Sequence, residues 1–381
     1  MKINVFGSTG EIGSKILYII YNYFPHIKIN LLVANENYSK LINQVKIYQP
    51  KKVCLANPNK IKFLKKSLNK KSVEILSKID LIGYLNTSKS DISILSIDGY
   101  EALNYFNSII KNTKNLGLVN KESVVSAGHL FAKIIKKNNV KIFPLDSEHF
   151  SLNSFFNNKK IISYNKIYLT ASGGPFLNKK LHLFKNITFK QAINHPKWKM
   201  GYKNSIDSAT LANKCLELVE AHYLFKIPFN NLDIVIHPES LVHSIIQFNN
   251  YTSIMNYFYN DMFIPLYNFL LYTSKNNKIV FQKNFDFNIN SNLKFYPVDN
   301  NKYPIYNIFK ELDKKNPVNL IKFNCGNEYA VNLFKNKMIK FNQIHEIVNK
   351  SLSIDFNSTV NDVESIIDYQ KSFSVKLREN L

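Results

Sequence analysis

Residues 2–23 read KINVFGSTGEIGSKILYIIYNY, and this stretch decides the fold. The apolar run Ile3–Phe6 predicts a strand, and the amphipathic pattern over Ile12–Tyr23 predicts a helix. Between them, the glycines of GSTGEIG at residues 7–13 permit a tight turn and a close backbone approach, with the helix N-terminus facing a pyrophosphate. Such a turn can be merely structural, but its place between a strand and a helix favours dinucleotide binding.

Strands and helices continue to alternate after this turn. Further strands are expected at Ile29–Ala34, Lys52–Leu55, Ser93–Ile97, Asn115–Val119 and Val140–Leu145, and a second helix at Tyr38–Tyr48. The alternation predicts a parallel sheet covered on both faces. We therefore assign residues 1–146 to an N-terminal, Rossmann-like domain of the α/β class that binds a dinucleotide.

The pattern changes after residue 146. Strands are expected at Ile161–Thr170, Asp233–His237, Ser244–Phe248 and Thr252–Phe258, and helices at Ser208–Phe225 and Met262–Tyr272. These elements predict a central α+β domain over residues 147–274. Residues 275–301 are polar and typical of a linker. Helical periodicity over residues 302–381 predicts a helical C-terminal domain, with Ser358 or Asn361 as the cap of its last helix.

The composition limits the classes of partner. The 381 residues include 50 Lys and Arg against 27 Asp and Glu, which gives a formal net charge of +23. Nearly all of the positive residues are lysines, in a chain rich in Asn and Ile, which is typical of drift in an AT-rich genome. We therefore expect no nucleic-acid partner, although the basic field would attract an anionic substrate. No apolar run could span a bilayer and no signal or transit segment is evident, so we expect no membrane partner and a cytoplasmic location.

The three cysteines indicate structural thiols in a reducing compartment. Cys54, Cys215 and Cys325 lie far apart and form no CxxC pair. Two alternative classes remain open: a phosphate-binding dehydrogenase with a cysteine nucleophile, and a basic nucleic-acid-binding protein with a degenerate nucleotide fold. Loss of activity on thiol alkylation would favour the dehydrogenase, and steeply salt-dependent DNA binding would favour the nucleic-acid-binding protein. Metal-dependent activity would favour neither of these two classes.

Residues 203–220, KNSIDSATLANKCLELVE, combine an apolar stripe with a polar one. In a single helix from Ser208, the polar stripe would hold Thr210, Asn213, Lys214 and Glu217, and the apolar stripe Leu211, Cys215, Leu218 and Phe225. Ammonium, amide and hydroxyl groups suit a phosphate, and a carboxylate one turn later suits a hard divalent cation. The alternative is an amphipathic surface helix with an ion pair between Lys214 and Glu217.

A cluster of acids follows the expected strand at Val140–Leu145, in the sequence Asp146-Ser147-Glu148-His149. Acids at the carboxyl end of a parallel strand lie where open α/β sheets bind ligands. Together with Glu217, Asp146 and Glu148 would offer three oxygen ligands to Mg²⁺ or Mn²⁺. Alternatively, Asp146 or Ser147 is simply the N-cap of a helix.

Two loops carry further polar groups. ASGGPF, at residues 171–176, exposes a hydroxyl and several N–H groups, which suits a phosphate. HPKWKMG, at residues 195–201, holds the only Trp, and this loop is either a lid over a bound substrate or a surface loop with a packed ring. His237 in IHPES is expected to be a hydrogen-bonded core histidine. Lys121, after a strand end, is either a surface residue or a cation that stabilises an oxyanion.

The second expected strand ends at Asn35-Glu36. An acid at this position normally binds the ribose hydroxyls of NAD and repels the extra phosphate of NADP. Glu36 therefore favours NAD, but Lys40 could still reach a phosphate, so the residues alone leave the preference open.

Seven motifs occur here in one order: GSTGEIG, VNKES, LDSEH, ASGGPF, HPKWKMG, SIDSATLANKCLELVEA and IHPES. With FNCGNEYAV near the C-terminus, around Asn327 and Glu328, they resemble the 1-deoxy-D-xylulose-5-phosphate reductoisomerase family over nearly the whole chain. The resemblance implies a homodimeric NADPH-dependent enzyme that uses Mg²⁺ or Mn²⁺, with Co²⁺ as a further possibility. It would rearrange and reduce a sugar phosphate, 1-deoxy-D-xylulose 5-phosphate, to 2-C-methyl-D-erythritol 4-phosphate in the methylerythritol phosphate pathway.

The resemblance also implies roles for individual residues, and it makes the central domain the catalytic, metal- and substrate-binding domain. The metal ligands would be Asp146, Glu148 and Glu217. The substrate would contact Ser147, Ser172, His195, Ser208, Asn213 and Lys214. The catalytic set would be Lys121, Glu148, His195 and Trp198. The cofactor would contact Gly7, Ser8, Thr9, Gly10, Glu11, Ile12, Asn35, Asn37, Asn120, Lys121, Glu122, Met200 and Gly201.

Three departures from the family pattern lie on the cofactor side. Glu11 stands where the family usually has Ser, Asn35-Glu36 replaces a small-then-basic pair, and Ser96 replaces a glycine. The two acids place negative charge near a polyanionic cofactor. We therefore expect a functional enzyme with weakened cofactor affinity.

Overall fold

The computed structural model describes the chain except for residues 69–72, 157–162, 199, 275–291 and 357. The chain divides into two compact units. The first comprises residues 1–120, 132–150 and 261–283, and the second comprises residues 121–131, 151–260 and 284–381.

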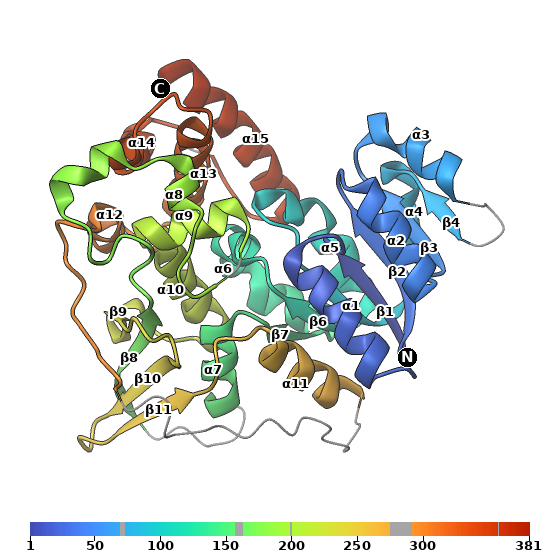
Figure 1. Ribbon diagram of the computed structural model, residues 1–381, viewed down its shortest axis with the longest axis horizontal. Coiled ribbons are helices and arrows are strands. Elements are labelled where there is room, and N and C mark those ends of the chain that lie inside the picture. The colour runs from blue at the N-terminus through green and yellow to red at the C-terminus, as the bar shows by residue number, and fades with distance from the viewer. Residues whose placement is uncertain (69–72, 157–162, 199, 275–291, 357) are drawn as a thin grey trace. The chain divides into compact units, whose positions relative to one another are not determined.

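A seven-stranded sheet forms the centre of the first unit (Figure 1). Its strands are β1 Lys2–Phe6, β2 Lys28–Ala34, β3 Lys52–Leu55, β4 Glu74–Leu76, β5 Ser90–Leu95, β6 Thr113–Leu118 and β7 Lys141–Pro144. All are parallel, in the order β4-β3-β2-β1-β5-β6-β7. The predicted parallel α/β sheet is therefore confirmed, and the short edge strand β4 is an addition that the sequence pattern does not predict.

Helices connect these strands. They are α1 Glu11–Tyr23, α2 Tyr38–Tyr48, α3 Pro58–Ser67, α4 Lys78–Thr87, the short η1 Tyr100–Ala102, α5 Leu103–Asn112, and α6 Lys121–Asn138, which begins in the second unit. A later helix, α11 Phe263–Ser274, also belongs to the first unit. It packs against α1, and its Leu266 and Leu270 share one apolar core with Ile16 and Ile20.

The strand order reverses beside β1. From β1 the chain first adds β2, β3 and β4 on one side, and β5, β6 and β7 then follow on the other side. Because parallel crossovers are right-handed, the two series place their helices on opposite faces of the sheet. Open sheets bind ligands outside the strand ends at such a reversal. Gly7 follows β1 and Ser96 follows the neighbouring β5, so the glycine turn lies at this point.

The second unit has a four-stranded mixed sheet in the order β11-β10-β8-β9. Strand β8 is parallel to β9 and antiparallel to β10. The strands are β8 Tyr164–Ala171, β9 Leu232–Ile236, β10 Val242–Phe248 and β11 Ser253–Tyr257. The helices are α7 Ser147–Phe156 (which begins in the first unit), η2 Leu181–Asn186, α8 Phe189–Ala192, α9 Tyr202–Thr210, α10 Ala212–Phe225, η3 Phe229–Asn231, α12 Pro304–Glu311, α13 Pro317–Lys335, η4 Phe341–Gln343, α14 Ile344–Ser353 and α15 Val363–Asn380.

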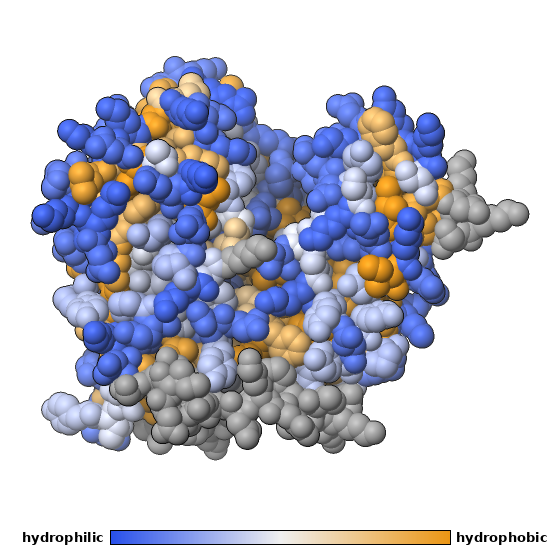
Figure 2. Space-filling view, in the orientation of Figure 1, coloured by the Kyte–Doolittle hydropathy of each residue, from blue (hydrophilic) through white to orange (hydrophobic). Residues whose placement is uncertain are grey.

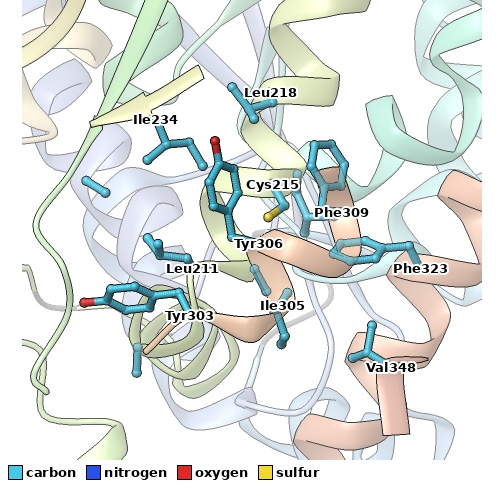
Figure 3. Close-up of a cluster of buried hydrophobic side chains, with 14 of the residues drawn as sticks. Leu211, Cys215, Leu218, Ile234, Tyr303, Ile305, Tyr306, Phe309, Phe323 and Val348 are labelled. Carbon is cyan, nitrogen blue, oxygen red and sulfur yellow. The ribbon is translucent and has the colours of Figure 1, made fainter. Parts of the chain in front are cut away.

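One apolar core joins the sheet and the C-terminal helices of this unit. Cys215 and Leu218 of α10 face Tyr306 and Phe309 of α12, and Phe323 of α13 lies beyond them (Figure 3). The apolar stripe predicted for α10 is therefore a core face. Its polar neighbours are buried as well: Lys214 is 7% exposed, and Glu217 and Glu220 are fully buried. The alternative of an amphipathic surface helix is wrong about the exposure of this helix, although its ion pair between Lys214 and Glu217 is present.

The single helix predicted over Ser208–Phe225 is also wrong. Leu211 has a φ of 63° and ends α9, and α10 begins at the next residue. A left-handed leucine costs about 1–2 kcal/mol, but this one is 1% exposed and anchored in the core. Burial of the leucine side chain offsets the strain, and no propensity rule predicts a break at such a residue.

Two smaller expectations change near the C-terminus. The last helix is capped by Asp362, which accepts a hydrogen bond from the Ser365 N–H, and not by Ser358 or Asn361. Of the expected linker, residues 275–291 lie outside the described residues, as do the first two residues of the expected strand Ile161–Thr170. The described end of the linker includes Tyr296, which forms an isolated bridge with Ile236.

The surface agrees with the lysine-rich composition. Hydrophilic residues cover most of the face in Figure 2, with hydrophobic residues in separate patches. Among the described residues, no helix combines the length and the apolar character that crossing a membrane requires.

Candidate active site

The glycine turn of the first unit forms a cradle that leaves no room for side chains. Gly7 has a φ of 83°, and a Cβ there would lie 2.4 Å from the Ser96 carbonyl oxygen. A Cβ on Gly13 would lie 2.2 Å from the Gly7 oxygen. The N-cap of α1 is Gly10, which supplies no side-chain cap to the first turn of the helix. A bare helix N-terminus beside a close backbone approach fits a pyrophosphate.

Two of the three departures from the family pattern are accommodated locally. Glu11 is exposed and lies in the first turn of α1, where its negative charge interacts favourably with the helix dipole. The Ser96 hydroxyl donates to the Phe6 carbonyl oxygen at 2.7 Å, which ties the ends of β1 and β5 together. Neither side chain therefore distorts the glycine turn.

The third departure, Glu36, has two partners from the segment after β3. Its carboxylate accepts a hydrogen bond from the Asn57 amide at 3.3 Å and lies 3.5 Å from the Lys60 ammonium. Its neighbour Asn37 caps α2 by accepting from the Lys40 N–H. The acid is therefore offset by a lysine that the sequence pattern did not single out.

The acids after β7 also belong to the first unit. Asp146 accepts a hydrogen bond from the Glu148 N–H at 3.3 Å, which is the N-cap geometry of α7. The same oxygen lies 3.4 Å from Nδ1 of the fully buried His149. The Ser147 hydroxyl donates to Glu148. The N-cap alternative is confirmed for Asp146, but a carboxylate has a second oxygen, so capping and cation binding are compatible.

In the second unit, the loop ASGGPF lies directly against α9. Gly173 and Gly174 have φ values of 80° and 66°, and a Cβ on Gly174 would lie 2.9 Å from the Ala209 Cα and 3.0 Å from the Ser208 oxygen. The Tyr303 hydroxyl donates to the Gly173 oxygen at 2.8 Å. Only glycine allows this approach, which brings the loop that carries Ser172 beside Ser208.

His195 orients Ser172. Its Nδ1 accepts the Lys197 and Trp198 N–H groups at 3.2 and 2.9 Å. In the neutral ring the proton is therefore on Nε2, which donates to the Ser172 Oγ at 3.0 Å. The Gly174 N–H donates to the same Oγ at 3.1 Å. Because Ser172 accepts twice in this arrangement, its own hydroxyl proton remains available for donation to a ligand.

Glu217 is the centre of a buried polar cluster. It is fully buried, and its Oε1 accepts from the Lys121 ammonium at 3.1 Å and from the Asn213 amide. Its Oε2 accepts from the Lys214 ammonium at 2.7 Å. Lys121 also donates to the Asn213 Oδ1 at 2.8 Å. Lys121 is 6% exposed, so the surface alternative for this residue is wrong.

A second buried cluster was not recognised from the sequence. The Lys203 ammonium lies 2.6 Å from Asp207 and 3.1 Å from Glu122. The Asn327 amide donates to the other oxygen of Asp207 at 2.8 Å. Burial acts to lower the pKa of Lys203, but Asp207, Glu122 and Glu328 outweigh it and raise that pKa. The only signal in the sequence was the spacing of Lys203 and Asp207, which are opposite charges four residues apart.

The remaining candidates have simpler surroundings. Trp198 is partly buried, with its ring 6.4 Å from that of His243. The Asn120 amide donates to the Ile97 and Gly99 oxygens. Met200 is partly buried and Gly201 exposed. His237 is buried, contacts the Lys294 oxygen at 2.9 Å and accepts the Leu241 N–H, so the prediction of a hydrogen-bonded core histidine is confirmed.

The cysteines offer no nucleophile. All three are buried. Burial raises the pKa of Cys54 to about 12, and it also raises the pKa values of Cys215 and Cys325. Such thiols stay protonated at neutral pH. This result argues against the alternative dehydrogenase with a cysteine nucleophile.

We predict that His195 stays neutral throughout the physiological pH range. Burial, aided by the Lys214 ammonium, lowers its pKa from 6.5 to about 4. Because the folded pKa is depressed, the stability that His195 contributes is fully present above pH 6.5 and is lost as the pH falls through 4. NMR titration of the His195 Cε1–H should show no transition between pH 6 and 8. His195→Gln serves to assign the signal, and a midpoint near 6.5 would contradict the prediction.

Three family models and curated relatives of one family match this chain over most of its length. A family model described as 1-deoxy-D-xylulose 5-phosphate reductoisomerase matches residues 3–128, and models of the C-terminal domain of that enzyme match residues 142–225 and 259–374. The reductoisomerase of Pelagibacter ubique is 37% identical over 378 residues, which is 97% of each chain. That of Clostridium tetani is 34% identical over 381 residues, 99% of each chain.

Solved structures of reductoisomerases also match the fold of this chain. The reductoisomerase from Zymomonas mobilis in complex with NADPH superimposes with a TM-score of 0.87 at 29% identity, covering 99% of this chain and 98% of that one. A DOX-P reductoisomerase in complex with NADPH, fosmidomycin and magnesium superimposes with a TM-score of 0.90 at 29% identity, covering 100% and 98%.

Proposed function

Because this chain belongs to the 1-deoxy-D-xylulose 5-phosphate reductoisomerase family, we propose a role for each of its active-site side chains in the reaction of that family. The chain is an NADPH- and divalent-metal-dependent oxidoreductase. It rearranges and reduces 1-deoxy-D-xylulose 5-phosphate to 2-C-methyl-D-erythritol 4-phosphate, in the methylerythritol phosphate route to isoprenoids.

We assign the substrate phosphate to Ser172, Ser208, Asn213 and Lys214. The glycine contact that brings the Ser172 loop beside Ser208 supports this assignment, as do the two hydrogen bonds that hold the Ser172 hydroxyl oxygen in place. Lys214 is buried, so its charge acts with little screening by water. Phosphate contacts remote from the reacting carbons supply binding energy that can drive loop closure.

We assign the divalent cation to Asp146, Glu148 and Glu217, each of which offers a carboxylate oxygen. Three hard oxygen donors suit Mg²⁺, and Mn²⁺ or Co²⁺ would accept the same donors. When bound, the cation supplies Lewis acidity at the vicinal oxygens of the substrate, and NADPH supplies hydride to the rearranged aldehyde.

The remaining side chains orient and shield the reacting carbons. The Lys121 ammonium, held by Asn213 and Glu217, would donate a hydrogen bond to a substrate oxygen as its charge grows. Ser147 would hold a second substrate oxygen. The backbone N–H of Trp198 donates to His195, and the Trp198 side chain would exclude water from the site. Met200 would lie against the nicotinamide.

The observation that carries this proposal is the Glu217 cluster. A fully buried carboxylate that meets two buried ammonium groups and an amide costs desolvation free energy, so the cluster contributes little to stability alone. The test is oxidation of NADPH with deoxyxylulose phosphate, with and without Mg²⁺. We expect metal-dependent turnover that thiol alkylation does not abolish. Turnover in the presence of a strong chelator would overturn the proposal.

We propose that Lys60 contributes to the preference for NADPH over NADH. Lys60 offsets Glu36, and with Lys40 it would attract the 2′-phosphate of NADPH, so the weakening expected from Glu36 is limited. Lys60→Ala should weaken NADPH binding about threefold to tenfold at low salt, since exposed charges are partly screened. NADH binding should change little.

Nicotinamide fluorescence would measure both dissociation constants without turnover. Lys62→Ala is the matched control, because Lys62 is an exposed lysine on the same helix whose ammonium lies over the Phe63 ring. Equal NADPH affinity in the Lys60 variant and the parent would contradict the assignment.

We also propose a cytoplasmic homodimer. Strand β11 is the edge of its sheet among the described residues, and it exposes Ile254 and Met255. An exposed apolar edge strand invites pairing with another chain. Sedimentation should give twice the monomer mass, and Ile254→Lys should favour monomers; a monomeric parent would refute the homodimer.

A further inference from the structure

Lys203 is the centre of a buried ion network, and neither Lys203 nor Asp207 has a role in the reaction chemistry described above. It lies on α9 and is 7% exposed, while its partners Asp207 and Glu122 are 0% and 3% exposed. The Lys203 ammonium contacts one oxygen of each partner, at 2.6 and 3.1 Å. Its positive charge in turn holds the pKa of Glu122 below its usual range, although burial acts to raise it.

The network extends to the C-terminal helices through Asn327. This residue of α13 is fully buried, and its amide donates to Asp207 at 2.8 Å. Three helices that are distant in the sequence, α6, α9 and α13, therefore meet at one cluster of buried polar groups. The α13 backbone is held closely in place, because a Cβ on Gly326 would lie 1.9 Å from the Ser351 Oγ.

Each ion partner of Lys203 is the sequence neighbour of a proposed substrate residue. Glu122 follows Lys121, whose ammonium binds Asn213 and Glu217. Asp207 precedes Ser208, against which the glycine loop packs. Fixing Glu122 and Asp207 therefore fixes the backbone from which Lys121 and Ser208 project.

A buried ion network contributes little to the free energy of unfolding. Desolvation of the charges offsets much of their attraction, and apolar side chains of similar size often stabilise a core more. Directional charged contacts do, however, define geometry more strictly than apolar packing. A displacement of about 1 Å in a catalytic group can cost about a hundredfold in rate.

We propose that Lys203 is a positioning residue, which holds the helix segments that carry Lys121 and Ser208 in their working geometry and makes α13 part of the support of the active site. The inference rests on the proposed roles of Lys121 and Ser208. It assigns no contact between Lys203 and the substrate.

The test compares Lys203→Met with Lys322→Met. Lys322 is the matched control, because it is also a buried lysine, 5% exposed, but its ammonium donates to the Ile354 oxygen, outside this network. We expect Lys203→Met to raise the KM for deoxyxylulose phosphate about tenfold or more and to lower kcat. Lys322→Met should lower the thermal midpoint and leave the KM for deoxyxylulose phosphate unchanged.

A third variant separates positioning from stability. Glu122→Gln, Lys203→Met and Asp207→Asn together remove the buried charges, so this variant should fold even where Lys203→Met does not. We expect its thermal midpoint to recover while the raised KM persists. Parental KM and kcat in this variant, or equal changes in Lys203→Met and Lys322→Met, would overturn the inference.

A readout without turnover distinguishes this inference from the proposed function. Inorganic phosphate binding, followed by ³¹P NMR, should weaken in the Lys203 variants and not in Lys322→Met. An inactive parent protein with this binding pattern would refute the proposed reaction and support the network. An active parent with unchanged phosphate binding in every variant would refute the network alone.

Discussion

Glu217→Gln should lower kcat/KM about a thousandfold or more while the protein stays folded. The substitution removes a proposed cation ligand and leaves the Lys121 and Lys214 ammonium groups around a neutral amide. Lewis-acid stabilisation is worth several kcal/mol, and each 1.36 kcal/mol corresponds to a factor of ten in rate. Steady-state kinetics over a range of Mg²⁺ concentrations would measure the loss.

The control for this variant is Glu220→Gln. Glu220 lies one turn further along α10 and is just as buried, but it is outside the proposed ligand set. It should lose stability and keep the parental dependence on Mg²⁺. The assignment of Glu217 fails when the two variants show the same Mg²⁺ dependence, or when Glu217→Gln keeps more than about a tenth of the parental kcat/KM.

Lys214→Met should raise the KM for deoxyxylulose phosphate about tenfold to a hundredfold. The change removes a charge-assisted hydrogen bond to the phosphate, and such bonds contribute about 1.5–3 kcal/mol. Because remote binding energy also drives closure, kcat should fall as well. Affinity for NADPH should remain, since Lys214 has no proposed contact with the cofactor.

Lys226→Met is the matched control, because Lys226 is an exposed lysine at the opposite end of α10. Inorganic phosphate should compete with the substrate in the parent and in this control, and only weakly in Lys214→Met. An unchanged inhibition constant for phosphate in Lys214→Met would remove Lys214 from the phosphate site.

Much of the first unit follows from local sequence patterns. Alternating apolar runs predict the parallel strands, and the spacing of Gly7, Gly10 and Gly13 predicts the turn, because both depend on residues close in the sequence. The sequence alone does not determine which residue caps a helix. Asp362 competes with Ser358 and Asn361 for the last helix, and only the path of the chain decides among them.

The proposed site residues come from sequence motifs, whereas residues that gain a role only through tertiary contacts were not singled out. Lys121 and Glu217 were recognised from motifs, but their hydrogen bond joins residues far apart in the sequence. Lys203 and Asp207 resemble an ordinary helical ion pair until Glu122 and Asn327 are placed beside them. Lys60, likewise, gains significance only from its contact with Glu36.

The left-handed Leu211 has a consequence for any attempt to transplant this site. An idealised scaffold would offer one straight helix for residues 202–225, since designed backbones avoid positive φ at leucine. Such a helix would rotate Lys203 and Asp207 relative to Asn213 and Glu217, because the left-handed residue resets the helical phase between the two groups. A graft of these side chains has to carry the strained joint with them, together with the apolar packing that holds Leu211 in place.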